Sequence, residues 1–548
     1  MSRKLFLPLS VVSLSVLLSA CGGAGNPLRS YDAELSETVT QVKAGQLQQA
    51  LDGLEKRNAP LAPTLGSKDA KDAKDAKPEE GKGDKSSVAG KIDGMMDNKD
   101  LLYFLEKGEL LSMQSKYPDS RDAWLKADDK IREWEDSFKL DAGKLFGDIA
   151  SYVVGDRVRR YDGQDYEKVF LSTRLTLNHI LRGDFASARV EMKKTYEREK
   201  LIEAFREKEY DALKDEGEKK GIKTTAKDLK DKGYPMAELD APEVSHLKNG
   251  FQNAFSHYLA GYFFEVTGEP SLAEPGYRNA LTLQPNSKLI RDGLSRVGKR
   301  KPGPKESDVL FVVESGFAPS WKSISIPLPL PMGSKGLVVT PLSFPVVKAE
   351  NKGFVPPSLT VGGKDLPVET LASVDAMSRR MLKDQLPGIM LRTGIRAIVK
   401  TVAQEQAQRV GGVVGGLVVG VASVLTEQAD ERAWRTLPER VSVARAILPY
   451  GKLPLSFQTD VGVHKTEITL GNRFTIVPIR LTGGAVFVGE QNVVPAMPEM
   501  VADSEPVEPP PAPVKKPKKA AKPKEGAQAA PATSPAAAAP KTAAPAAK

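Results

Sequence analysis

The sequence predicts an α+β protein, in which a domain of α-helical hairpins precedes a smaller antiparallel β domain with a long helical insertion. Three observations support this class. Small residues recur at fixed offsets in the N-terminal half, β-branched runs punctuated by Pro and Gly begin after Lys305, and a Pro/Ala/Lys-rich tail ends the chain.

Residues 1–20 have the pattern of a secretory signal peptide. Arg3 and Lys4 precede an apolar run that ends in the small residues before Cys21. The stretch Leu18-Ser19-Ala20-Cys21 fits a lipobox, in which the cysteine thiol receives a diacylglyceryl group before cleavage. A membrane-spanning helix is the alternative, but the run is shorter than the roughly 20 residues that cross a bilayer. We therefore expect a mature chain that begins at a lipidated Cys21.

Cys21 is the only cysteine in the 548 residues, which excludes a disulfide and a cysteine-based metal site. Gly22 follows it, where an aspartate would favour the inner membrane. The expected location is the outer membrane of a Gram-negative bacterium, facing the periplasm, with the lipid holding the protein at the surface.

The formal net charge of +9 lies mostly at the end of the chain. After Glu508 the sequence carries eight lysines against Glu525 alone, so the preceding body is nearly neutral and offers no basic fold for nucleic acid. Residues 503–548 contain no large apolar side chain after Val514, which predicts a disordered tail. Its lysines are candidates for contact with peptidoglycan or anionic lipid. Residues 64–92, where Lys-Asp-Ala is repeated three times, are expected to be a charged disordered linker.

One stretch before residue 300 matches the tetratricopeptide (TPR) pattern, a pair of antiparallel helices with small residues at their contact. The matching residues are Gly261, Gly268, Ala273, Tyr277, Ala280 and Pro285. A Gly followed five residues later by Ala recurs at Gly183/Ala188 and Gly45/Ala50, and a weaker copy has Pro118 before Ala123.

The four alanines of these copies are 73, 65 and 85 residues apart, whereas a tandem array repeats at about 34 residues. We therefore expect degenerate TPR-like units with inserted helices. They form a lipid-anchored hairpin at 21–63 and a TPR-like domain at 93–300. A generic bundle of helical hairpins is the alternative.

Strands are expected in a β-rich domain at 306–490, with a helical insertion at 368–430. The strand-like runs are 309–313, 323–326, 337–340, 455–457, 466–470, 475–481 and 485–488. Gly471-Asn472 and Gly483-Gly484 are the turn signals between the last three runs, so a small antiparallel sheet is expected there.

The stretch 410–425 has no charged residue and places Gly412, Gly416 and Gly420 at intervals of four. On a helix this makes a glycine stripe that another helix can approach closely. A buried or partner-packing helix is the favoured interpretation, and contact with a membrane is the alternative.

A search for catalytic or metal-binding residues finds little. The four histidines show no metal-ligand spacing, and no glycine-rich phosphate loop follows a strand. His179 and His257 are expected to have packing or surface roles. We expect no cofactor, no metal and no catalytic residues, and hence a protein that is not an enzyme.

Several segments together resemble a poorly characterised family of TPR-like lipoproteins of Gram-negative bacteria. They are 161–167, the helix leading to 183–191, 312–316 and 426–438. Members of this family are often encoded near lipoproteins that activate penicillin-binding proteins, so the resemblance implies work in the cell envelope. The linker and the basic tail depart from the family's pattern.

Two classes of function follow. The first is a membrane-anchored scaffold whose TPR-like groove binds a peptide or protein of the envelope. The second is an enzyme of envelope polymers such as a murein hydrolase, which would require a carboxylate pair or a nucleophile in a cleft. A component of a secretion or polysaccharide-export machine differs from the scaffold only in its partner.

Overall fold

The computed structural model describes residues 30–58, 99–140, 160–299, 301–331, 336–348, 353–426 and 428–491, with only the backbone for 337, 348 and 403–426. All of these residues belong to one compact unit. The chain is 52% helical and 23% strand, which confirms the predicted α+β class. The predicted signal peptide at 1–20, the predicted lipid site Cys21, the predicted linker 64–92 and the predicted tail 503–548 lie outside the described residues.

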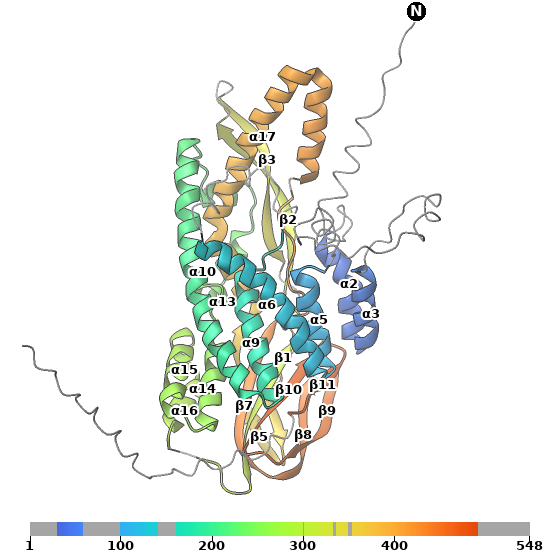
Figure 1. The fold of residues 1–548 in the computed structure, drawn as a ribbon, viewed down its shortest axis with the longest axis vertical. Coiled ribbons are helices and arrows are strands. Elements are labelled where there is room, and N and C mark those ends of the chain that lie inside the picture. Colours follow the sequence, from blue (N-terminus) through green and yellow to red (C-terminus); the bar gives the residue numbers. More distant parts are fainter. Residues whose placement is uncertain are drawn as a thin grey trace, which may run out of the picture. The chain divides into compact units, whose positions relative to one another are not determined.

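The described helices that precede the strands pair into hairpins 1 to 4, each joined by a tight turn (Figure 1). The hairpins are α2 (Tyr31–Lys43) with α3 (Leu47–Arg57), α5 (Leu101–Met113) with α6 (Tyr117–Leu140), α9 (Asp165–Leu181) with α10 (Phe185–Lys219), and α14 (Ala254–Val266) with α15 (Pro270–Leu283). The remaining helices of this half are α11 (Ala226–Asp231), α12 (Met236–Leu239), α13 (Pro242–Ser245) and α16 (Lys288–Arg296). Polar caps begin several of them, because the side chains of Ser30, Asp100, Asp184 and Asn253 accept a hydrogen bond from the backbone three residues later.

The strands form three sheets. A five-stranded sheet has the order β11-β10-β1-β7-β6, a four-stranded sheet has the order β5-β4-β8-β9, and β2 and β3 form a two-stranded ribbon. Their bounds are β1 Glu306–Ser315, β2 Ser320–Pro331, β3 Leu337–Lys348, β4 Ser358–Val361, β5 Lys364–Pro367, β6 Glu369–Ser373, β7 Arg440–Pro449, β8 Gly451–Thr459, β9 Gly462–Leu470, β10 Phe474–Leu481 and β11 Val486–Val488.

The five-stranded sheet is mixed, so the prediction of an antiparallel sheet is wrong for one pair. β1 pairs in parallel with β10, from Asp308 opposite Phe474 to Ser315 opposite Leu481. On its other side β1 pairs antiparallel with β7. Parallel neighbours need a long connection, and all the strands from β2 to β9 lie between β1 and β10 in the chain. Turn signals report only on neighbours in sequence, so they could not predict this pair.

The two glycine turns near the C-terminal end of the fold have different outcomes. Gly483-Gly484 joins β10 to β11 in an antiparallel pair, as predicted. The hairpin expected across Gly471-Asn472 is wrong, because β9 and β10 lie in different sheets. The physical reason is burial: β9 alternates between exposed and covered residues, whereas nearly every residue of β10 is buried. Two covered faces suit a strand of a middle layer.

The five-stranded sheet lies between the helices and the four-stranded sheet. On β1, Val309, Phe311 and Val313 belong to the core shared with β4, β5, β8 and β9. Leu310 and Val312 alternate with them and belong to the core shared with the helices. This two-sided burial explains why β1 is an unbroken apolar run instead of an alternating one.

The predicted insertion at 368–430 contains both a strand and a helix. Residues Glu369–Ser373 form β6 at one edge of the five-stranded sheet, and α17 (Val374–Thr426) follows directly. Pro387 lies inside this helix. The first part of α17 packs against α10 and the β2–β3 ribbon.

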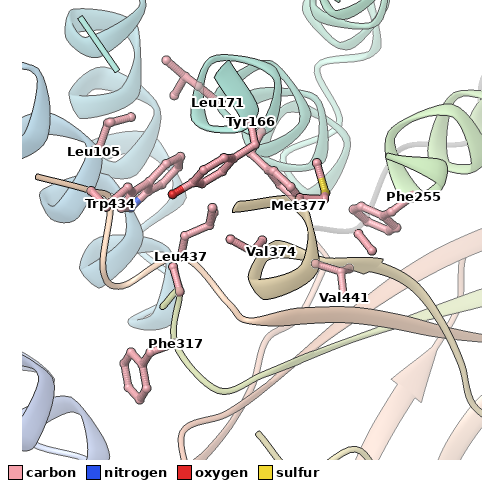
Figure 2. Close-up of a cluster of buried hydrophobic side chains, with 14 of the residues drawn as sticks. Leu105, Tyr166, Leu171, Phe255, Phe317, Val374, Met377, Trp434, Leu437 and Val441 are labelled. Carbon is pink, nitrogen blue, oxygen red and sulfur yellow. The ribbon is translucent and has the colours of Figure 1, made fainter. Parts of the chain in front are cut away.

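One hydrophobic cluster joins the helical hairpins to the sheet. It contains Leu105 of α5, Tyr166 and Leu171 of α9, and Trp434 and Leu437 of the segment between α17 and β7 (Figure 2). Trp124 of hairpin 2 contacts Trp434 edge to face, with ring centroids 6.4 Å apart. This pair packs hairpin 2 against the segment that leads into β7. The ranges 93–300 and 306–490 therefore share one buried core.

Candidate functional site

The hairpin turns repeat one backbone geometry. Gly45, Gly183 and Gly268 have φ values of +78°, +78° and +85°, a region that glycine adopts without steric cost. In each turn the residue after the glycine donates its N–H to the carbonyl of the residue five positions before it, as in a Schellman motif. Hairpin 2 has the same pattern around Ser115, whose φ is +57°.

The second helix of each hairpin places a small buried residue five positions after the turn residue. Ala50, Ala188 and Ala273 occupy this position and are fully buried. In hairpin 2 the position belongs to Ser120, whose Oγ donates to the Gly108 carbonyl at 2.8 Å. The alignment of the weaker copy on Pro118 and Ala123 is therefore wrong by three residues. A positive φ at serine is uncommon, so the sequence search for glycine or proline missed it.

The two helices of hairpin 4 are in close contact. A Cβ at Gly261 would lie 2.9 Å from the Tyr277 ring, and a Cβ at Gly276 would lie 2.6 Å from the backbone of Gly261. Ala280 is also fully buried. Gly108 faces Trp124 in hairpin 2 in the same way. The small residues singled out in the sequence therefore lie at helix contacts.

The structure describes only the backbone of the glycine stripe. Gly412, Gly416 and Gly420 lie within α17, but the side chains around them lie outside the described residues. Among the described helices, none is both long and apolar enough to cross a membrane.

Two buried glutamates hold the segment 434–436 against the helices. Glu106 of α5 accepts hydrogen bonds from the backbone N–H of Arg435 at 2.7 Å and of Thr436 at 3.0 Å. Glu167 of α9 accepts from the N–H of Trp434 at 2.7 Å. Burial raises the pKa of Glu106 above its usual value, and burial raises that of Glu167 to about 7. Both carboxylates are hydrogen-bonded to the backbone of 434–436, so they stabilise the packing of this segment on the helices.

A second buried group links the helices to the middle of the sheet. The Arg174 guanidinium of α9 bridges Glu109 of α5 and Glu314 of β1. Burial, with the nearby Glu314 carboxylate, raises the pKa of Glu109 to about 7. Burial also lowers the pKa of Arg480 on β10 to about 10, and its Nη2 donates to the Thr436 carbonyl at 3.0 Å.

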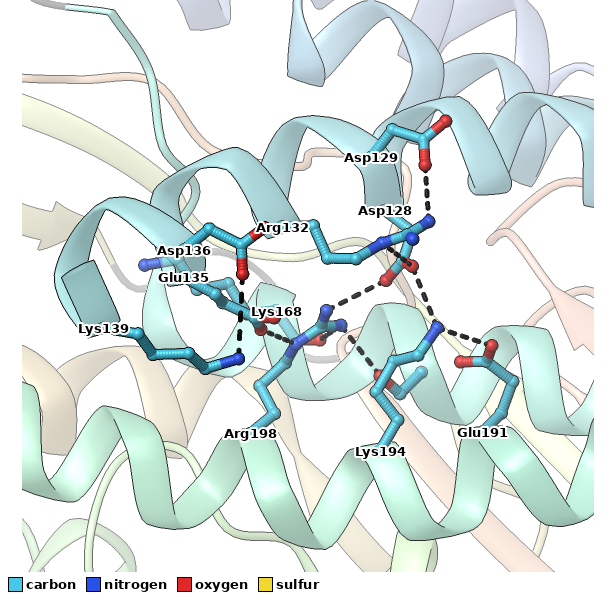
Figure 3. A network of polar contacts seen from close by, with 11 residues as sticks. Asp128, Asp129, Arg132, Glu135, Asp136, Lys139, Lys168, Glu191, Lys194 and Arg198 are labelled. Atoms are coloured by element: carbon cyan, nitrogen blue, oxygen red, sulfur yellow. Dashed lines mark hydrogen bonds and ion pairs between the residues drawn. The ribbon is translucent and has the colours of Figure 1, made fainter.

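Charged ties also join hairpins 2 and 3. Figure 3 shows Arg198 of α10 donating to Glu135 at 2.6 Å and to Asp128 at 2.9 Å, both on α6. Lys194 lies one helical turn before Arg198 on α10, and its Nζ is 2.9 Å from the Asp128 carboxylate. Because Arg198 and Asp128 are fully buried and paired, removing either one would leave an unpaired charge.

The histidines on the repeats have packing partners. His179 Nδ1 lies 3.1 Å from Asp184, and His257 Nε2 lies 3.1 Å from Glu199. Within the described ranges, no three His, Cys, Asp or Glu side chains come together in a way that could hold a metal ion.

A groove of about 550 Å³ separates the end of hairpin 4 from the edge of the five-stranded sheet. Residues 283–287 form one wall, including the predicted repeat residue Pro285, and residues from 243 to 254 contribute a second. The third wall is β6 with Ala376 and Met377 of α17. The lining combines apolar side chains such as Leu247, Leu283 and Met377 with amides, hydroxyls and ionisable groups, and it contains no Trp, Tyr or Phe. The ionisable residues are Glu243, His246, Lys248 and Glu369.

Three polar side chains of this groove are fixed by the fold. Glu369 accepts the N–H of Leu289 at the start of α16, at 3.1 Å. Gln284 Nε2 donates to the backbone carbonyl of Leu371, at 3.2 Å. Asn253 accepts at Oδ1 from both the N–H and the hydroxyl of Ser256, at 2.8 and 2.9 Å. An N–H can only donate, so these bonds fix the orientation of the Asn253 amide.

The Asn253 amide nitrogen has no hydrogen-bond partner among the described residues, although Asn253 is only 3% exposed. A buried donor without a partner costs on the order of 1–3 kcal/mol. Sequence reasoning did not single out Asn253 or Gln284. The available signal was an Asn directly before an apolar helical run, which predicts a helix cap and gives no information about a groove.

Two smaller hollows accompany this groove. One of about 370 Å³ lies between hairpins 1 and 2, and charged side chains line it, among them Glu55, Lys107 and Lys116. One of about 260 Å³ lies beside Arg445, whose guanidinium is held by Asp308 at 2.6 Å and Glu265 at 2.8 Å. Three charged residues of this hollow, Glu265, Asp308 and Arg445, are therefore already paired with one another.

Comparisons of the chain with protein-family models, with curated proteins and with solved structures find no match.

Proposed function

We propose that the protein is a lipid-tethered scaffold of the Gram-negative cell envelope, which holds a peptide or protein partner through a TPR-like domain of helical hairpins. Cys21 is the lipid attachment site, and the chain faces the periplasm from the outer membrane. The proposal assigns no catalytic residue and no cofactor. A role in peptidoglycan assembly or maintenance fits the family resemblance.

One observation carries the scaffold assignment. The hairpins repeat the same turn and the same small buried residue five positions later, as expected for degenerate TPR-like units. Stacked helical hairpins present grooves to partner segments. The buried carboxylates of Glu106, Glu167 and Glu109 are engaged by neighbouring parts of the chain, which favours structural roles for them over catalysis.

The membrane part of the proposal is tested by metabolic labelling with palmitate. The wild-type chain should be labelled and recovered with outer membranes, and Cys21→Ser should lose both properties. A Cys21→Ser variant that stays labelled and membrane-bound would contradict the proposal.

The partner part is tested by mild crosslinking in cells followed by co-purification. A scaffold should retain a defined envelope protein, and retention should depend on the hairpins. Gly261→Leu would separate the helices of hairpin 4, and Gly268→Ala would disturb only its turn. An assay of the purified protein on peptidoglycan provides the counter-test, because turnover there would indicate a hydrolase instead.

A further inference from the structure

The β2–β3 ribbon has one buried face and one exposed apolar face. Residues that lie directly opposite each other in an antiparallel pair project to the same face. Leu328 belongs to the face that is buried in the main hydrophobic cluster. The other face carries two facing pairs whose side chains are all exposed, Val339 by 67%. These pairs are Pro327 with Pro341 and Pro329 with Val339.

No charge interrupts this exposed apolar face. Among the described residues between Lys322 and Lys348, none is charged. The exposed valines of the turn between β8 and β9 differ, because Val461 directly follows Asp460. A continuous exposed apolar surface on a folded chain marks a site of contact with a protein or a membrane.

Prolines make this surface a poor template for another strand. Pro327 lies opposite Pro341, and two facing prolines cannot exchange N–H···O bonds, so this class of position points its N–H side away from the partner strand. Pro329, Pro331 and Pro345 occupy the same class of position. The outward N–H is therefore missing at each of these sites. A strand edge with fewer free donors also loses less free energy when it enters an apolar medium.

A lysine-rich segment runs alongside the ribbon. At one end, a Cβ at Gly221 would lie 3.9 Å from Pro331 Cγ. At the other end, the Tyr234 hydroxyl donates to the Pro345 carbonyl at 2.8 Å. Figure 1 shows the ribbon beside α10 and α17, the helices that pack next to it. Between these two contacts Leu229 is fully buried, and four lysines are exposed. They are Lys223, Lys227, Lys230 and Lys232.

This segment has an excess of positive charge. Residues 219–232 contain six lysines and two aspartates. Lys219 and Lys220 are paired with Glu216, and Asp228 is engaged in the capping box that begins α11. Long lysine side chains can place their ammonium groups several carbon atoms away from the backbone. Lysines beside an exposed apolar surface are typical of proteins that bind anionic bilayers.

We infer that the exposed apolar face of the ribbon docks on an anionic phospholipid bilayer. The prolines and Val339 enter the boundary between head groups and acyl chains, and the ammonium groups of 223–232 contact the phosphates. A bilayer suits this surface better than a protein strand does, because it requires no hydrogen bond from the missing N–H groups. The inference goes beyond the proposed function, because this contact needs no lipid on Cys21.

The test uses the mature chain carrying Cys21→Ser and made without residues 1–20, so that no acyl chain contributes and every described residue is kept. Val339→Cys then gives a single attachment point for an environment-sensitive fluorophore. Vesicles of phosphatidylglycerol and phosphatidylcholine should brighten its emission and shift it to shorter wavelength. Phosphatidylcholine alone should produce little change. The control position is Val461→Cys, which is 73% exposed on the four-stranded sheet and should not respond.

Variants of the labelled Val339→Cys chain separate the apolar and the charged contributions. Pro329→Asp places a charge on the apolar face and should raise the lipid concentration at the titration midpoint at least tenfold. Its matched control is Pro454→Asp, at an exposed proline of β8, which should leave the midpoint unchanged. Circular dichroism and thermal unfolding check that each variant is folded.

The charged contribution is tested by three simultaneous reversals. Lys223→Glu, Lys227→Glu and Lys230→Glu together should raise the midpoint at least tenfold, and the remaining binding should depend less on salt. The control makes the same change in net charge on the four-stranded sheet and should shift the midpoint less than twofold. It consists of Lys364→Glu, Lys452→Glu and Lys465→Glu, all at exposed positions.

Four results would overturn the inference. The first is a chain that sediments with anionic vesicles while the fluorophore at 339 does not respond, which would assign binding to another region such as the basic tail. The second is an equal response at 339 and 461. The third is a shift at 339 that grows with protein concentration in the absence of vesicles, which would identify a second copy of the chain as the occupant. The fourth is an unchanged midpoint after the reversals at 223, 227 and 230.

These outcomes are independent of the tests of the proposed function. A response at 339 in a chain that takes no palmitate and retains no envelope protein in cells would leave the inference standing. Conversely, palmitate labelling and co-purification without a response at 339 would leave only the proposed function.

Discussion

The β2–β3 ribbon and β6 are packed alike on one face but differ at their edges. Leu328 of the ribbon and Leu371 of β6 are both buried in the main hydrophobic cluster. In the ribbon, prolines occupy the outward N–H positions on both strands, whereas β6 has five residues, carries a bulge between Thr370 and Ala372, and faces a groove. Edge protection is thus a local property of each strand, independent of how firmly that strand is held: prolines protect the ribbon, whereas short length and a bulge protect β6.

The largest expected effect tests whether the two strands are held equally. Leu328→Ala and Leu371→Ala should each lower the free energy of unfolding by about 2–5 kcal/mol, because each empties a fully enclosed site. Urea unfolding followed by circular dichroism measures both. A Leu371→Ala variant as stable as the wild-type chain would mean that β6 is loosely attached, and the comparison of edges would lose its basis.

The next effect concerns the segment that anchors the end of β6. Val374 N–H, directly after β6, bonds to the Glu439 carbonyl, a few residues beyond the segment that Glu167 holds. Burial raises the pKa of Glu167 to about 7 from 4.5, so the folded chain keeps a proton that the unfolded chain loses between these values. The free energy of unfolding should therefore fall as pH rises from 4.5 to 7, by up to about 3 kcal/mol from this group.

Glu167→Gln cannot titrate and should lose this dependence. Urea unfolding at pH 5, 6, 7 and 8 gives the difference between wild type and variant, with the exposed Glu37→Gln as the control. A difference that is constant with pH, or that changes in the opposite direction, would be incompatible with a raised pKa.

A third change breaks the protection of the ribbon. Replacing Pro327 and Pro329 with valine restores two outward N–H groups on an exposed edge. Self-association should tighten by about tenfold, which light scattering across a concentration series can measure. Ser325→Val adds a similar apolar surface without a new N–H and should leave association unchanged. Equal association of the two variants would show that apolar surface, and not the freed edge, is responsible.

The smallest effect sharpens the description of β6. Gln284→Ala removes the side chain that occupies the Leu371 carbonyl, which should cost about 0.5–1.5 kcal/mol of stability. Urea unfolding followed by circular dichroism measures the loss, and an unchanged free energy of unfolding would argue that this hydrogen bond does not stabilise β6.

Much of the local structure could be predicted from sequence. The turns at Gly45, Gly183 and Gly268 required glycine, and the small residues behind them were recognisable by spacing. The strand at β1 was visible as a β-branched run. In contrast, Ser115 escaped notice, because its positive φ is permitted by the turn's hydrogen bonds and not by its own residue type.

The candidate site was largely hidden from sequence reasoning. Of its lining, only Pro285 had been singled out, and for its role in ending a repeat helix. β6 lay inside the predicted helical insertion, because five residues of mixed polarity carry little periodic signal next to a 53-residue helix. The groove joins segments from 243 to 377 in the sequence, and proximity of that kind leaves no local pattern.

The sequence by itself determined the hairpin turns, most of the helices, and apolar strands such as β1 and β10, because capping, φ preference and hydrophobic spacing act over a few residues. It also predicts a lipobox at Cys21. Only the tertiary structure decided that β1 pairs in parallel with β10, that buried glutamates accept hydrogen bonds from the backbone at 434–436, and that β6 lines a groove. These features depend on which distant segments exclude water from one another, and that is a property of the assembled core.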